Sequence, residues 1–150
     1  MAGSGLGGKY ALIGMAESDV GIVPDKSPRE LCGQVTLDAI RDAGLTLADV
    51  DGLITCNAFA EPIMYHAEAV AEYIGWQPRH CVTVNTGGGT TFMALNMAAA
   101  AIEAGMADTI VVAMADSLRS FMTREQAMVV QSSSGHPHYC LLYTSPSPRD

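Results

Sequence analysis

The sequence predicts an α/β layered fold, in which a mostly parallel sheet is covered by helices on both faces. Short apolar, β-branched runs alternate with longer segments of helical period along most of the chain. Each helical segment ends at a glycine, namely Gly44, Gly75 or Gly105. The run TIVVAMA at 109–115 is apolar at consecutive positions, as expected for a strand buried on both faces. Right-handed crossovers between such strands place helices on both faces of the sheet.

The first predicted strand covers residues 10–15, and a polar loop over 17–26 follows it. A helix then starts at SPRE, residues 27–30. Its serine can cap free N–H groups, its proline takes the first helical position and its glutamate the third. This helix is expected to end at Gly44.

The alternation then repeats along the chain. Further strands are expected over 52–56, 81–85 and 109–115, and further helices over 66–74 and 90–104. Beyond Asp116 the periodicity fades, and residues 118–139 are predicted to be a polar segment in which SSSGHP marks a loop.

The segment 81–105 is the centre of this arrangement. A strand stops at three glycines, Gly87 to Gly89, and a helix follows that is apolar on nearly every side, so we expect it to be buried all round. A sharp turn into a helix directs free N–H groups and the positive end of the helix dipole at whatever lies on the turn. The candidate binding residues are Asn85, Gly87, Gly88, Gly89, Thr90 and Thr91.

Composition narrows the possible partners. No apolar run reaches the roughly 18 residues of a membrane span, and the start of the chain lacks the features of a signal peptide, so a cytoplasmic protein is expected. The formal charge is −8, and the eight Lys and Arg residues are not clustered. This argues against nucleic acid and anionic lipid as partners and leaves small molecules or proteins.

Several other sites are disfavoured by their spacing. The cysteines form no CxxC pair and are expected to be reduced core residues: Cys32, Cys56, Cys81 and Cys140. A cluster of His136, His138 and Cys140 lacks a fourth ligand, so no metal site is expected. His66 and His80 are interpreted as solvated or core-edge residues.

Two nucleotide-binding patterns and a hydrolase pattern are also disfavoured. The glycine turn has no lysine that could reach a phosphate, and the chain has no GxSxG motif for a serine hydrolase. The pattern GxGxxG at residues 3–8 precedes the first strand instead of following it. Residues 1–8 are therefore interpreted as a flexible leader.

From residue 9 to 139 the motifs resemble the thiolase superfamily. They are a GMAES turn after the first strand, a helix ending in AGL, then VDGLIT, VN-x-x-x-G leading into an alanine-rich helix, and AG-x-A-D-x-I-V-V-A. The closest likeness is to sterol-carrier type thiolases, and it covers their amino-terminal half only. It implies a thiolase-like amino-terminal domain at 9–117 and the start of a loop or cap segment at 118–139.

The resemblance also implies function. It implies a five-layer fold of two similar halves, a homodimer and an acyl-CoA substrate, with coenzyme A as part of the substrate and no other cofactor. The family's nucleophilic cysteine stands three residues after the asparagine, and here that position is Gly88. The catalytic histidine and second cysteine belong to the carboxyl-terminal half. The chain itself is therefore expected to be inactive.

Three hypotheses follow from the resemblance. The first is a thiolase-like acyltransferase of lipid metabolism, of the acetyl-CoA acetyltransferase type. The second is an acyl-CoA carbon–carbon lyase of the aldolase type that works with an OB-fold partner protein, which the glycine at position 88 favours. The third is a non-catalytic scaffold that binds acyl-CoA. In the second and third, the N–H groups of Gly88, Gly89 and Thr90 are expected to hold a thioester or enolate oxygen.

The last residues differ from the rest. LLYTSPSPRD, residues 141–150, has no hydrophobic period and two closely spaced prolines, and it resembles a translated sequencing adaptor. We therefore expect residues 140–150 to be an artefactual tail.

Overall fold

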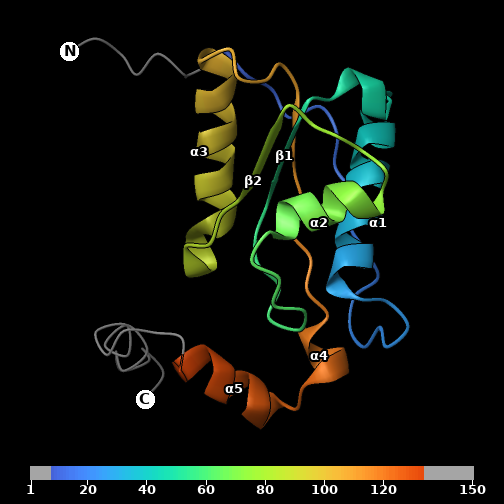
Figure 1. Cartoon of the computed structure of the whole chain (residues 1–150), viewed down its shortest axis with the longest axis vertical. Coiled ribbons are helices and arrows are strands. Elements are labelled where there is room, and N and C mark those ends of the chain that lie inside the picture. The colour runs from blue at the N-terminus through green and yellow to red at the C-terminus, as the bar shows by residue number, and fades with distance from the viewer. Residues whose placement is uncertain (1–7, 134–150) are drawn as a thin grey trace, which may run out of the picture.

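A small parallel sheet forms the centre of the computed structural model, which describes residues 8–133 (Figure 1). Its strands are β1 (Gly52–Thr55), β2 (His80–Thr83) and β3 (Ile110–Val112), in the order β2-β1-β3. Gly52 pairs with both His80 and Ile110, so the three strands start together. The sheet therefore has an amino edge, where all strands begin, and a carboxyl edge, where they end.

Helices cover both faces of the sheet, which confirms the predicted layers (Figure 1). α1 (Pro28–Asp42) and α2 (His66–Tyr73) lie on one face, and α3 (Thr90–Glu103) lies on the other. Two short 3-10 turns, η1 (Leu47–Asp49) and η2 (Gly87–Gly89), precede β1 and α3. Each predicted helix up to α3 is present, with bounds within a residue or two of those expected.

Alternation along β1 divides the core into two parts, because successive side chains of a strand point to opposite faces. Leu53 packs with residues of α1 and α2, including Cys32 and Val70, whereas Ile54 packs with Val84 and Ala94 on the α3 side. Leu53 and Ile54 are both fully buried. β1 thus joins the two layers.

α1 starts as the sequence predicts. The Glu30 N–H donates to Ser27 Oγ (3.2 Å), and the Ser27 N–H donates to Glu30 Oε2 (2.7 Å), so two free donors of the helix start are satisfied reciprocally. At the other end Gly44 has φ +72°, which favours glycine and ends the helix.

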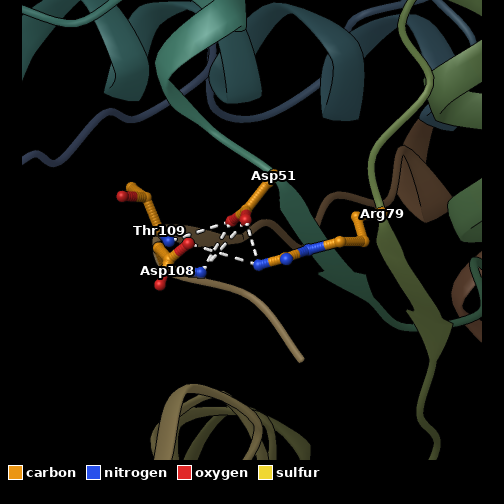
Figure 2. A network of polar contacts seen from close by, with 4 residues as sticks. All are labelled: Asp51, Arg79, Asp108 and Thr109. Atoms are coloured by element: carbon orange, nitrogen blue, oxygen red, sulfur yellow. Dashed lines mark hydrogen bonds and ion pairs between the residues drawn. The ribbon is translucent and has the colours of Figure 1, made fainter. Parts of the chain in front are cut away.

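A polar network closes the amino edge (Figure 2). Asp51 accepts from the N–H groups of Asp108 (2.9 and 3.1 Å) and Thr109 (2.9 Å), and from Arg79 Nη2 (2.7 Å). Arg79 Nη2 also contacts Asp108 Oδ2 at 3.3 Å. Since these residues directly precede β1, β2 and β3, the network joins the starts of all three strands.

The prediction of a strand over residues 10–15 is wrong. The segment is not in a strand, and Leu12 is 82% exposed. It is attached to the helix layer instead, because the Met15 N–H donates to Asp42 Oδ2 (2.9 Å). An apolar run becomes a strand only where a neighbouring strand supplies hydrogen-bond partners, and none of the strands in residues 8–133 pairs with it.

The prediction that the helix after the glycines is buried all round is also wrong. α3 buries small residues, among them Ala94, Ala98 and Ala101, against the sheet. Phe92 and Met93, at its start, are 74% and 45% exposed. The sheet covers only one side of α3, and no element within residues 8–133 covers the other (Figure 1).

Residues 118–133, predicted as part of a polar segment in which the periodicity fades, form α4 (Leu118–Phe121) and α5 (Arg124–Ser133). α5 starts at a reciprocal cap, in which the Thr123 N–H donates to Gln126 Oε1 (2.9 Å) and the Gln126 N–H donates to Thr123 Oγ1 (3.3 Å). The T-x-x-Q spacing is a sequence signal for this start. Both helices lie apart from the three layers (Figure 1).

Some predictions fall outside the described residues. They concern the leader up to residue 7, the part of the SSSGHP loop from residue 134 on, the histidine–cysteine cluster at 136–140 and the tail at 140–150. The first two serines of SSSGHP, Ser132 and Ser133, are described and belong to α5, so the prediction that the loop starts there is wrong. The proposed division at residues 117 and 118 stays a prediction.

Candidate functional site

The glycine turn lies at the carboxyl edge of the sheet, between β2 and α3. The Val84 N–H donates to Thr55 O (2.8 Å), so pairing with β1 continues one residue past β2 before the chain turns. Val84 is buried, and the chain is then exposed from Asn85 through Gly89. In open α/β sheets, ligands bind outside the carboxyl ends of the strands. The turn has that position.

The three glycines differ in what their backbone requires. Gly87 has φ +69°, a left-handed conformation that side chains rarely adopt. Gly88 and Gly89 lie outside this range, and a Cβ added at either would meet no heavy atom within 4 Å. The fold therefore requires glycine at Gly87 and leaves room for a side chain at Gly88, the position of the nucleophile in the family that the sequence resembles.

Thr90 closes the turn with its side chain. Its Oγ1 accepts from the Thr86 N–H (2.9 Å), lies 3.4 Å from the Thr86 hydroxyl, and donates to Gly87 O (2.6 Å). Thr90 is only 5% exposed. Thr91 is exposed, and its hydroxyl is directed to Met114 Sδ (3.4 Å). Of the two threonines, only Thr91 therefore lies open to a ligand.

The N–H groups of the turn are not equally free. The Thr90 N–H donates to Gly87 O and is therefore already used within the turn, so the expectation that it holds a ligand oxygen stays a prediction. The Gly87 N–H has a long contact of 3.4 Å to Asn85 Oδ1. Gly88 is the second residue of η2, which runs directly into α3, and an N–H at this position has no acceptor within the helix. The Gly88 N–H is therefore a donor that the turn presents.

Burial raises the pKa of the thiol in each of the three described cysteines, Cys32, Cys56 and Cys81. Burial, with a smaller effect of the Glu68 charge, raises the pKa of the Cys81 thiol to about 11. Burial and the neighbouring Cys56 raise the pKa of Cys32 to about 12. Such thiols carry little thiolate at neutral pH. Cys32 is buried as predicted, whereas Cys56 and Cys81 are half-buried, and all three are free.

His66 is a buried polar residue of the carboxyl edge. It is the first residue of α2, is 0% exposed, and its Nδ1 lies 3.4 Å from the hydroxyl of Thr55. Burial lowers the pKa of His66, and this outweighs the carboxylates of Glu61 and Asp116, which raise it. The expectation of a solvated or core-edge residue is therefore wrong for His66, whereas His80 is a partly exposed residue at the start of β2.

The turn is open to solvent on the side away from the sheet. Two surface hollows, of about 490 and 540 Å³, lie beside α1 and beside α4 and α5, and neither is lined by a residue of the turn. Binding sites for small molecules usually enclose most of the ligand. A ligand at the turn would need further walls.

Residues 8–133 contain neither a group of metal-ligating side chains nor a membrane-spanning helix. No three His, Cys, Asp or Glu side chains in this range are grouped so as to hold a metal ion. No helix there has the length and apolar content required to cross a bilayer.

Comparison with known proteins places this architecture among thiolase-like proteins. No protein-family model matches the chain. It is 30% identical to 17-hydroxy-3-oxo-4-pregnene-20-carboxyl-CoA lyase from Mycobacterium tuberculosis, over 89% of this chain and 36% of that protein.

Two solved structures share the fold. They are 3-oxoacyl-[acyl-carrier-protein] synthase III from Aquifex aeolicus (TM-score 0.58, 19% identity) and the Ltp2-ChsH2(DUF35) aldolase (TM-score 0.56, 28% identity). The matches cover 69% and 71% of this chain, and 35% and 28% of those chains. The chain thus spans about a third of the length of the relatives that it matches.

Proposed function

Because this chain is a thiolase-like protein, we propose that it binds an acyl-CoA thioester at the turn of Gly87 to Gly89 and takes part in cleaving a carbon–carbon bond of that thioester. One observation carries the proposal: Gly88 has room for a side chain and a backbone conformation that allows one, yet has none. The names of two similar proteins, a CoA lyase and an aldolase, support the same chemistry.

The reaction that fits such a turn is a retro-aldol cleavage of a 3-hydroxyacyl-CoA. A base removes the proton of the 3-hydroxyl. The carbon that carries this hydroxyl, C3, then becomes a carbonyl carbon as its bond to the α-carbon breaks. The electron pair of that bond moves toward the thioester and forms an enolate, which a proton then converts into the shortened acyl-CoA. The reaction needs stabilisation of the enolate oxygen and no covalent bond to the enzyme.

The turn supplies this stabilisation in the proposed mechanism. The Gly88 N–H donates to the thioester oxygen, and the positive end of the α3 dipole favours the negative charge that develops there. A side chain at Gly88 would occupy the space beside this donor. Acyl transfer through a thioester on the enzyme is the competing function, and it requires a nucleophile that Gly88 lacks.

We further propose an assembly in which other protein surfaces complete the site. The aldolase of the structural comparison is named with a second component, ChsH2(DUF35), which supports a partner protein here, and an OB-fold protein is the partner that we propose. The exposed side chains of Phe92 and Met93 beside the turn support a covering surface, and a homodimer is the form that we propose.

Coenzyme A enters only as part of the substrate. The free cysteines are consistent with the cytoplasmic location that we propose.

The test is whether the turn carries an acyl group. The protein is incubated with acyl-CoA labelled in its acyl group and quenched in acid, and label on the protein is counted. We expect none on the natural chain and thiol-sensitive label on Gly88→Cys. Gly89→Cys is a matched control, because its position is equally open but one residue out of register. Stoichiometric label on the natural chain would overturn the proposal in favour of acyl transfer.

A second assay separates cleavage from binding alone. 3-Hydroxy-3-methylbutyryl-CoA is the probe, since its retro-aldol cleavage gives acetone and acetyl-CoA, and both can be measured. Release of both products in equal amounts supports the lyase. Binding of the probe without products, in the presence of the OB-fold partner, would favour the non-catalytic scaffold.

A further inference from the structure

The Thr90 hydroxyl bonds only to the turn that precedes it. It accepts from the Thr86 N–H at 2.9 Å, donates to Gly87 O at 2.6 Å, and lies 3.4 Å from the Thr86 hydroxyl. Thr90 is 5% exposed, although residues 85–89 before it and 91–93 after it are all exposed. A buried hydroxyl thus spans an otherwise open loop.

These bonds leave the hydroxyl with nothing to donate to a ligand. A threonine hydroxyl has one proton and two lone pairs. The proton goes to Gly87 O, and the lone pairs face the N–H and the hydroxyl of Thr86. The side chain therefore cannot serve as a proton donor for the reaction while the turn keeps this form.

The turn needs such a restraint because it is made of glycines. Glycine loses more conformational freedom on ordering than any other residue, and three in a row have no side chains to hold them. A donor stabilises a developing charge well only if it is held in place beforehand. Since Gly87 O also accepts the Thr90 N–H, two bonds from one residue fix the peptide between Gly87 and Gly88. That peptide carries the Gly88 N–H.

We propose that Thr90 is a positioning residue, whose buried hydroxyl fixes the glycine turn so that the Gly88 N–H is held toward the thioester oxygen of a bound acyl-CoA. The inference rests on the proposed function and adds a residue that acts without touching the substrate. Thr90→Val keeps the shape and removes the hydroxyl, whereas Thr90→Ser keeps the hydroxyl and removes the methyl group.

The experiment measures recognition of the carbonyl oxygen alone. Acetyl-CoA and S-ethyl-CoA differ in that only the first has a thioester oxygen, so the ratio of their dissociation constants reports the bond from the Gly88 N–H. We expect the natural protein to bind acetyl-CoA about tenfold more tightly. In Thr90→Val the ratio should fall to about twofold or less, with binding of S-ethyl-CoA unchanged, and Thr90→Ser should restore it. A loss of structure alone would weaken both ligands equally.

The outcomes separate the two proposals. If the natural protein does not prefer acetyl-CoA, the proposed function of the turn fails and the role of Thr90 fails with it. If the natural protein has the preference and Thr90→Val keeps it, only the role of Thr90 is overturned. Thermal melting checks that the variants fold. If Thr90→Val and Thr90→Ala do not fold but Thr90→Ser does, the hydroxyl serves stability and the positioning role is likewise overturned.

Discussion

The amino edge of the sheet is closed by a polar network, whereas the carboxyl edge is open at the glycine turn. At the amino edge, the Asp51 carboxylate accepts from the Arg79 side chain and from the backbone N–H groups before β3, so the starts of three strands are joined (Figure 2). At the carboxyl edge, the chain after β2 passes through three exposed glycines that have no side chains to pair. The amino edge uses its polar groups for stability, and the carboxyl edge leaves a backbone donor free for a ligand.

The charge of Asp51 shows what the closed edge contributes. Burial alone would raise the pKa of Asp51, but the N–H groups of Thr109 and Asp108, together with Arg79, lower it overall. A carboxyl whose pKa is lowered by folding stabilises the folded state above its ordinary pKa of 3.8, and this contribution is lost as the pH falls below that value.

The largest expected effect comes from opening the amino edge. Asp51→Ala removes the acceptor of three charge-assisted hydrogen bonds and leaves two N–H groups without a partner, so the free energy of unfolding should fall by about 2–3 kcal/mol. Urea denaturation at pH 7 measures it. Asp19→Ala is the control, since Asp19 is 69% exposed and its contact with Lys26 is long, at 3.4 Å. That change should stay within about 0.5 kcal/mol, and equal effects would contradict the role of Asp51.

A smaller effect is expected within the glycine turn. Gly87→Ala places a Cβ on a residue with φ +69°, which should cost about 1–2 kcal/mol of stability. Gly88→Ala meets no neighbouring atom and no left-handed backbone, so it should be neutral or stabilise the fold by up to about 1 kcal/mol. The two variants carry the same change one residue apart, and their unfolding curves compare them directly. Equal losses would show that the fold requires both glycines, which removes the chemical argument from Gly88.

Acid should weaken the carboxyl edge through His66. Folding lowers the pKa of His66 below its ordinary value of 6.5, chiefly by burial, so the unfolded chain takes up a proton more readily than the folded one. The contribution of His66 to the free energy of unfolding is therefore lost as the pH falls below about 6.5. In melts between pH 7.5 and 5, His66→Asn should flatten this slope, whereas His80→Asn leaves His66 in place and should keep it. An unchanged slope in His66→Asn would contradict the assignment.

The parts of the fold that the sequence predicted depend on local signals. The capping serine and glutamate of SPRE and the glycines at helix ends act within one turn of helix, so they marked α1 and the end of α3 without knowledge of the fold. The apolar run at 10–15 has an equally clear local pattern, but a strand needs a partner from elsewhere in the chain. The helix α5 has a local signal as well, T-x-x-Q at 123–126, which is a capping pattern and not a hydrophobic period.

The candidate site divides in the same way. The glycines between a strand and a helix predicted the turn, because a tight turn needs residues that can adopt a left-handed backbone conformation, as Gly87 does. The roles within it were not predictable: Thr90 lies beside Thr91 in sequence, yet only Thr90 is buried. His66 is buried next to Thr55, a strand residue 11 positions earlier. Burial of such groups depends on which segments meet, and the sequence does not show this directly.

The smallest expected effect on stability concerns the apolar surface beside the turn. Phe92 is 74% exposed and next to Met93, which is 45% exposed, so Phe92→Ser removes little buried area and should change the free energy of unfolding by no more than about 0.5 kcal/mol. It should nevertheless reduce self-association, because contiguous exposed apolar side chains mark contact surfaces. Sedimentation velocity over a range of concentrations measures the association. Val20→Ser is the matched control: Val20 is 92% exposed but lies in the polar loop before α1, away from the turn, and its loss should leave association unchanged. If Phe92→Ser associates as strongly as the natural chain, the surface beside the turn is not the contact. In that case no second copy of the chain would cover the apolar side chains beside the turn, and the carboxyl edge would be exposed to solvent as well as to ligand.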